Sequence, residues 1–261
     1  MRKFPLLAAF ILFLLLAQLS APGQPRAETL HFVTQEFAPF SYLEDGYVAG
    51  PIRDAIQRVC LEAGLDCGFE VLPWPRAQHK VQVGEAQGLF VVGKTTERLS
   101  WLEFSPPLVS SRYGVFVHLD DPLIFRSISD LIGYTVGVYG PSATYEALLE
   151  IQEKLEGKLR IEVRPDDIQG FLKLDTKRVN AVFSNRDVGF SIIRSEKLNN
   201  IRYAGDYRQT YYYVALSRDH VSKEIRHRFF SAFNDLIRKG ELQKIITAYG
   251  LAPIIRPESG Q

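Results

Sequence analysis

The feature that most constrains the fold is an alternation of two hydrophobic periods that begins near residue 29. Strand-like apolar segments are separated by segments that repeat an apolar residue every three or four positions. The strand-like segments are 30–34, 68–72 and 89–92, and the helix-like segments are 51–64 and 75–84. Because strands that alternate with helices pair in parallel through right-handed crossovers, this region predicts a βαβαβ unit.

The same alternation restarts further along the chain and predicts a second α/β unit. Its expected strands are 112–118, 135–140, 160–164, 179–184 and 201–205, and its expected helices are 142–155, a short helix after Asp166, and 187–197. A further strand at 211–217 and two helices, about 222–238 and 241–249, follow. The two units share no sequence repeat, so we expect two lobes of one architecture.

Residues 1–27 have the layout of a secretory signal peptide. A basic start at Arg2 and Lys3 precedes an apolar run, and small residues and prolines follow up to Ala27. The apolar run at 6–19 is shorter than the roughly 20 residues that span a bilayer, although a retained anchor is the alternative. We expect the mature protein to start between Gln24 and Glu28, and to lie free in the periplasm or outside the cell.

The charge balance excludes a protein that binds nucleic acid through a basic surface. Residues 1–27 hold three of the 31 basic residues and none of the 30 acidic ones, which leaves 28 against 30. The chain contains no phosphate-binding loop, HExxH or GxSxG motif, and its five histidines lack ligand spacing. We therefore expect no cofactor, no metal and no enzymatic activity.

Cys60 and Cys67 lie seven positions apart, at the end of an expected helix and the start of an expected strand. In an oxidising compartment this spacing favours a short-loop disulfide over two free thiols. With no third cysteine and no CxxC motif, a redox or zinc role has little support.

Five segments in order resemble the family 3 extracellular solute-binding proteins, the periplasmic receptors of polar amino-acid ABC transporters. They are "EFAPFSYLEDGYVAG", "TTER" with "EFSPP", "DLIGYTVGVYGPSATYE", "KRVNAVFSN" and "ELQKIITAYG". The cysteine spacing also resembles the disulfide of the histidine-type members. The resemblance covers about 29–250 and implies a two-lobe α/β fold with ligand between the lobes. Lobe 1 would hold 28–117 and 213–261, lobe 2 would hold 118–212, and hinge strands near 113–118 and 211–214 would join them.

Arg98 is the leading candidate for a ligand-binding residue. It follows a buried strand, and the carboxyl ends of strands are where open α/β sheets bind ligands. Its planar guanidinium can hold a carboxylate through two parallel hydrogen bonds, and a solvated surface arginine is the alternative. The resemblance implies that Arg98 binds the α-carboxylate of a ligand, with Thr95 beside it.

The turn before the helix at 142–155 is a second candidate for carboxylate binding. Ser142, Ala143 and Thr144 offer free amides at a helix N-terminus, where the helix dipole favours an anion. The resemblance implies that this turn holds the same carboxylate from lobe 2. Capping of the helix by Ser142 is the alternative, and both can hold together.

Aromatic residues supply the remaining contacts that we expect. The resemblance implies that Phe37 stacks on the ligand, and Trp74 lies just before a helix near the pocket edge. Two positions depart from the family pattern. Asn185 stands where an aspartate usually pairs with the α-ammonium, and Gly93 replaces a common hydroxyl residue. These departures favour a ligand that is more negative or less positive than an ordinary amino acid.

The leading functional hypothesis is a monomeric receptor that closes on a small carboxylate-bearing solute and presents it to an ABC permease in the inner membrane. The second hypothesis is a periplasmic enzyme similar to the cyclohexadienyl dehydratases, for which Glu36 is the only candidate acid. The third is a sensory module that delivers its ligand to a membrane receptor.

Overall fold

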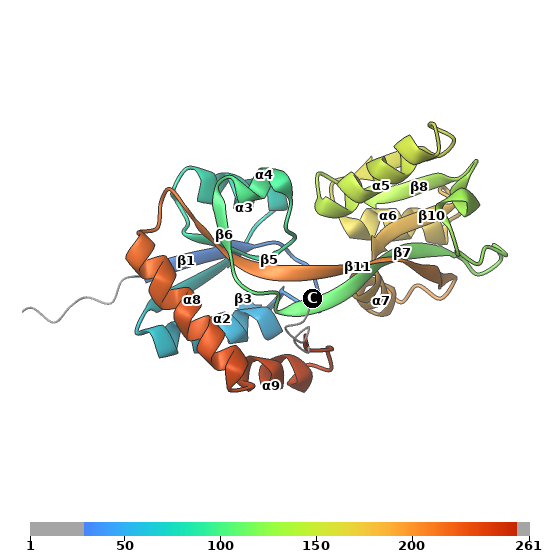
Figure 1. Cartoon of the computed structure of the whole chain (residues 1–261). Coiled ribbons are helices and arrows are strands. Elements are labelled where there is room, and N and C mark those ends of the chain that lie inside the picture. Colours follow the sequence, from blue (N-terminus) through green and yellow to red (C-terminus); the bar gives the residue numbers. More distant parts are fainter. Residues whose placement is uncertain (1–28, 255–261) are drawn as a thin grey trace, which may run out of the picture.

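The computed structural model describes residues 29–254, which form two α/β lobes joined by two long strands (Figure 1). The predicted signal peptide, residues 1–27, lies outside the described residues. One continuous sheet runs through both lobes in the order β4-β1-β5-β11-β7-β10-β8-β9, and β6 pairs with β11 off this path. The sequence-based prediction of a two-lobe α/β fold is confirmed.

The first lobe is built on parallel pairing of β1 with β4 and β5. Its strands are β1 (Thr29–Thr34), β4 (Asp66–Val71), β5 (Gly88–Val92) and β6 (Leu102–Phe104), and its helices are α2 (Pro51–Ala63), α3 (Trp74–Gln82), α4 (Thr96–Leu99), α8 (Lys223–Arg238) and α9 (Glu241–Ala248). Helix α2 packs against α8 and α9 on one side of the sheet, and α3 and α4 lie on the other (Figure 1). The predicted stop of α2 is confirmed, because Gly64 adopts a left-handed φ of 64° and its N–H caps the helix.

The second lobe repeats this layering over parallel strands. Its elements are β8 (Thr135–Tyr139), β9 (Arg160–Arg164), β10 (Ala181–Asn185), α5 (Ala143–Lys154), α6 (Asp167–Asp175), α7 (Arg186–Ser195) and the short 3-10 helix η2 (Ile128–Leu131). One side of its sheet packs with α5 around Val115, Val138 and Phe183, and the other packs with α6 and α7 around Phe116 and Phe171.

Two antiparallel strands, β7 (Val109–His118) and β11 (Ile201–Ser217), pass from one lobe to the other (Figure 1). The sequence predicted separate strands at 201–205 and 211–217, but β11 is a single strand of 17 residues. Its exposed middle accommodates the polar run between the two apolar segments. Residues 113–117 of β7 pair with β10 of the second lobe, which favours a lobe boundary earlier than residue 117. The exact division between the lobes stays a proposal.

A hairpin that the sequence analysis missed precedes α2. Strands β2 (Tyr42–Glu44) and β3 (Tyr47–Ala49) pair around Asp45 and Gly46, both of which have positive φ. An Asp-Gly pair is a strong hairpin signal because both turn positions need such φ values. The predicted disulfide between Cys60 and Cys67 is confirmed, and it links the end of α2 to β4.

Candidate functional site

Arg98 lies in the first lobe, on α4, and is only 4% exposed. Its Nε and Nη2 donate to Gln78 Oε1 at 3.2 and 3.1 Å, and its Nη1 donates to the carbonyl oxygen of Gly93 at 3.0 Å. The guanidinium also lies over the ring of Trp74, 5.2 Å from its centroid. The fork that can bind a carboxylate is therefore held by an amide oxygen, a backbone carbonyl and an aromatic face.

Burial lowers the pKa of Arg98, while the charge of Glu146 across the cleft opposes that shift. An arginine stays protonated despite such a shift, so the group remains a buried cation. Gln78 is a neutral acceptor that a ligand carboxylate can replace with a charge-assisted pair.

Thr95 and Ser142 both act as helix caps. The Thr95 hydroxyl accepts from the Arg98 backbone N–H at 3.3 Å, which caps α4. The Ser142 hydroxyl accepts from the Tyr145 N–H at 3.1 Å and donates to the Tyr139 carbonyl at 2.7 Å. Capping, one of the two alternatives for Ser142, is thus realised here.

Gly93 and Ala143 mark a close approach of the two lobes. A Cβ built on Gly93 would lie 3.3 Å from the Ala143 Cβ and 3.8 Å from Arg98 Nη1. The lobes also meet where the Tyr139 hydroxyl donates to Gln35 Oε1 at 2.9 Å. A hydroxyl residue at position 93 would press against Ala143 of lobe 2, which explains sterically why glycine stands there.

A cavity of about 620 Å³, here called the apolar cavity, lies between the lobes at the carboxyl ends of the parallel strands. It has the size of a small-molecule site. The predicted ligand residues Phe37 and Trp74 line it, and both are buried. Its other apolar walls come from both lobes and include Leu43, Val71, Leu72, Ile168, Val188 and Ile192.

A second cavity, of about 400 Å³ and here called the polar cavity, is lined by Gly93, Thr95 and Ala143 together with parts of α5 and β11. Its charged lining residues are Lys94, Glu146, Glu150 and Arg208. Arg208 and Glu150 already pair at 3.0 Å. The predicted ligand residues are therefore divided: Phe37 and Trp74 face one cavity, and Gly93, Thr95 and Ala143 face the other. Arg98, Ser142, Thr144 and Asn185 are not among the described lining residues of either.

The apolar cavity contains carboxyl groups with raised pKa values. Burial raises the pKa of Asp167 to about 6, against a hydrogen bond from the Ser184 hydroxyl, and the charge of Asp166 adds to the rise. Burial also raises the pKa of Glu36, and the Leu43 N–H that donates to Glu36 Oε2 at 3.0 Å opposes this rise. Desolvation disfavours the charged form of both carboxyl groups.

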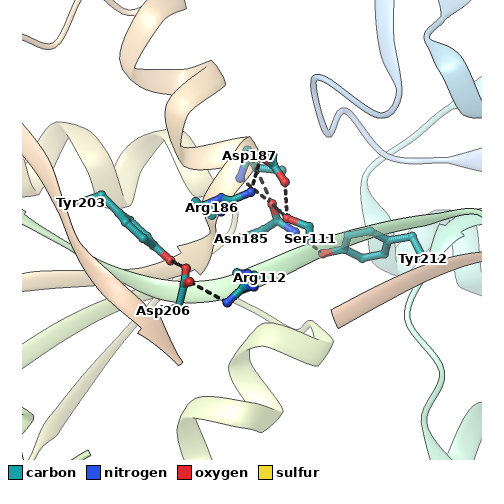
Figure 2. Close-up of polar contacts among 9 residues, drawn as sticks. Ser111, Arg112, Asn185, Arg186, Asp187, Tyr203, Asp206 and Tyr212 are labelled. Atoms are coloured by element: carbon teal, nitrogen blue, oxygen red, sulfur yellow. Dashed lines mark hydrogen bonds and ion pairs between the residues drawn. The ribbon is translucent and has the colours of Figure 1, made fainter. Parts of the chain in front are cut away.

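Asn185 lies in a polar network where β7 and β11 cross between the lobes (Figure 2). Its Oδ1 accepts from the Asp187 and Val188 N–H groups, at 2.9 and 3.2 Å, and from the Ser111 hydroxyl at 2.9 Å. Its Nδ2 donates to the Tyr212 hydroxyl at 2.9 Å. These contacts cap α7 and tie it to both crossing strands, while a contact of Asn185 with ligand stays a prediction.

Three residues that the sequence analysis did not assign to the site stand at the cavity: Gln35, Tyr139 and Asp167. Gln35 directly follows β1, Tyr139 is the last residue of β8, and Asp167 lies three residues after the end of β9. The rule that ligands bind beyond the carboxyl ends of strands, applied to every strand, would have found all three. Gln78 gave no such signal, because only the fold brings it to Arg98.

Within residues 29–254, no helix is long and apolar enough to cross a membrane. Among the same residues, His, Cys, Asp and Glu side chains form no group of three that could hold a metal ion.

Solved structures share this fold at low sequence identity. A histidine kinase sensor domain with similarity to periplasmic binding proteins superposes with a TM-score of 0.79 and 18% identity, over 88% of this chain and 99% of that domain. An ancestral arginine-binding protein bound to arginine gives 0.75 and 19%, over 85% and 97%. An amino acid ABC transporter substrate-binding protein from Streptococcus pneumoniae bound to L-arginine gives 0.71 and 22%, over 85% and 94%.

Comparison by sequence gives a family. No curated protein matches the chain. The model of the bacterial extracellular solute-binding proteins, family 3, matches residues 31–252. This match spans both lobes and the two crossing strands, and the chain therefore belongs to the family 3 bacterial extracellular solute-binding proteins.

Proposed function

We propose that the protein is a periplasmic receptor that closes on a small solute between its lobes and delivers it to an ABC permease. The apolar cavity carries the proposal, because both lobes line it and its volume of about 620 Å³ suits a small molecule. Contacts from one solute to two lobes favour the closed state over the open one. The structurally similar proteins named above are binding proteins and a sensor domain, which supports binding in preference to catalysis at Glu36.

A carboxylate on the solute would be held by Arg98 after exchange with Gln78. In the unliganded protein the Gln78 amide oxygen accepts hydrogen bonds from two guanidinium N–H groups of Arg98, at 3.2 and 3.1 Å. A carboxylate would use the same two N–H groups. Trp74 lines the apolar cavity and also lies against Arg98, so movement of this cluster would connect the cavity to the arginine.

A thermal-shift screen over amino acids, dicarboxylates and amines, followed by calorimetry, tests the receptor function, since a ligand of the native state stabilises it by mass action. The absence of any stabilising solute would contradict the function. Gln78→Ala then tests the carboxylate site: it should tighten carboxylate binding several-fold, because Arg98 no longer has to release an internal acceptor. Gln82→Ala, at the exposed end of the same helix, should leave affinity unchanged. If Gln78→Ala binds the carboxylate as tightly as the wild type does and no more, the proposal that Arg98 binds the carboxylate is contradicted.

Delivery of the solute to a membrane sensor is a second candidate, favoured by the 0.79 TM-score to a kinase sensor domain. Uptake of radiolabelled solute by cells lacking this gene separates the two. Lost uptake supports transport, whereas normal uptake with a lost transcriptional response supports sensing.

A further inference from the structure

The charged groups that line the apolar cavity all have one sign. They are Glu36, Asp166, Asp167 and Glu196, and none of the described lining residues is Lys, Arg or His. Arg98, which touches the cavity wall through Trp74, is directed to Gln78 and the Gly93 carbonyl. The cavity therefore offers a solute acidic groups and apolar surface.

Of the four carboxyl groups, Asp167 is the one that is half-buried, lines the cavity and makes a single hydrogen bond among the described residues. Asp166 is occupied in capping α6, where its two oxygens accept from the backbone and side-chain nitrogens of Gln169 at 2.8 and 2.7 Å. Glu36 accepts from the Leu43 N–H, and both Glu36 and Glu196 are exposed residues at the rim. These three carboxyl groups are each either satisfied or hydrated.

Asp167 is the first residue of α6. This helix begins shortly after the end of β9, beside the apolar cavity. Its Oδ1 accepts from the hydroxyl of Ser184, a residue only 1% exposed, at 2.9 Å. Among residues 29–254, the Asp167 carboxylate makes no other hydrogen bond and no ion pair. The residue is half-buried, and desolvation raises the pKa of its carboxyl to about 6, so the group is mostly ionised at neutral pH.

A half-buried carboxylate without a cation carries a desolvation cost that one hydrogen bond compensates only in part. A positive group that enters the cavity and pairs with Asp167 removes that cost, whereas a second carboxylate would increase it. Phe37 and Trp74 add aromatic surface, which favours an organic cation over a hydrated metal ion. Walls from Leu72, Val188 and Ile192 favour an apolar body on the solute.

We infer that the solute is an organic cation with an apolar body, an ammonium or guanidinium compound whose charged group pairs with the carboxylate of Asp167. This inference rests on the proposed receptor function, because it names the solute class for the same cleft. It places the positive end of the solute on lobe 2, at α6, and does not need Asn185. A cationic solute differs from the more negative or less positive ligand that Asn185 and Gly93 favour in the sequence, because that expectation did not include the carboxyl groups of the cavity. A carboxylate on the same solute is compatible only where it reaches Arg98.

The test uses matched probes on the mature protein at pH 7.5. Phenethylamine, cyclohexylamine and agmatine supply cations, and 2-phenylethanol and cyclohexanol, which have no charged group, are the neutral counterparts of the first two. We expect at least one cation to raise Tm and to bind in calorimetry at least tenfold more tightly than its neutral counterpart. Asp167→Asn, which keeps the shape and the acceptor for Ser184, should weaken that cation at least tenfold. Asp66→Asn makes the same charge change at an exposed site on β4 and should leave binding as it is.

Three results would overturn the inference: neutral counterparts that bind as tightly as the cations, a cation whose affinity Asp167→Asn leaves unchanged, or no cation that raises Tm. A Tm of the unliganded variant at or above that of the wild type shows that the variant is folded. A dicarboxylate that binds both proteins equally would leave the receptor function standing and remove the cation site. Failure of every solute would remove both.

Discussion

Arg98 is buried and Asp167 is half-buried, on opposite lobes, and the protein compensates the two charges to different degrees. The Arg98 guanidinium has the oxygens of Gln78 and Gly93 and the ring of Trp74. The Asp167 carboxylate has the hydroxyl of Ser184. Both groups bear part of the cost of leaving water, but Arg98 has several partners inside the fold and Asp167 has one.

The difference predicts that the Arg98 charge stabilises the unliganded protein, whereas the Asp167 charge destabilises it until a cationic ligand binds. A buried charge whose hydrogen bonds are made within the protein contributes to stability, and its removal leaves the partners unpaired. A buried charge with few partners destabilises the unliganded state, and its removal relieves that state. The same kind of substitution should therefore have opposite effects at the two positions.

The largest expected effect comes from Arg98→Ala. It leaves Gln78 Oε1 and the Gly93 carbonyl without their donors in a buried place, so we expect a loss on the order of 3 kcal/mol in the free energy of unfolding, measured in urea. Arg76→Ala, at an exposed arginine of α3, should change stability by less than about 0.5 kcal/mol. A similar small change for both variants would mean that the Arg98 cluster is not structural.

Asp167→Asn should raise the stability of the unliganded protein at pH 7, on the order of 1–2 kcal/mol, because it removes a desolvated charge and keeps the Ser184 contact. The gain should depend on pH. The folded-state pKa of about 6 lies above the ordinary value of 3.8, so the wild type loses stability as pH rises from about 4 to 6. The difference between variant and wild type should be near zero at pH 4 and complete above pH 6.5.

Urea titrations of both proteins at several pH values measure this difference. The groups that face Asp167 are Asp166 at the helix cap, Tyr139 at the end of β8 and Tyr212 on β11, and burial raises the pKa of both tyrosines further above this range. Glu36 titrates from the opposite lobe and is present in both proteins. A constant difference across the pH range would show that the Asp167 carboxyl is not desolvated.

The smallest effect is expected for Thr95→Ala, which removes the cap of α4 and costs about 1 kcal/mol. Ser222→Ala removes the corresponding cap of α8, on the side of the lobe away from Arg98, and should cost a similar amount. A much larger loss for Thr95→Ala, again in urea, would show that the position of Arg98 depends on its helix as well as on its side-chain partners.

The sequence predicted most elements because local patterns encode them. Gly64 ended α2 as expected, and the strands before Arg98 and Asp166 ended at residues 92 and 164, where the sequence predicted their ends. The site was predicted less well because its contacts join distant segments. Gln78 and Arg98 lie 20 positions apart, and Ser184 on β10 contacts Asp167 on α6, 17 positions away. No periodicity carries that information, and the position of a residue after a strand indicates only that it stands near the cleft.

The position of β11 in the sheet also determines which lobe can finish folding first during synthesis. Strand β5 pairs with β1 on one edge and with β11 on the other, and α2 packs against α8. During synthesis, which starts at the N-terminus, β1, β4, β5 and α2 are made early. The elements that complete their packing, β11 and α8, are made near the C-terminus. The second lobe comes from one uninterrupted stretch of chain between the crossing strands. The lobe that begins first thus finishes last, and until then it exposes an open sheet edge and the apolar face of α2.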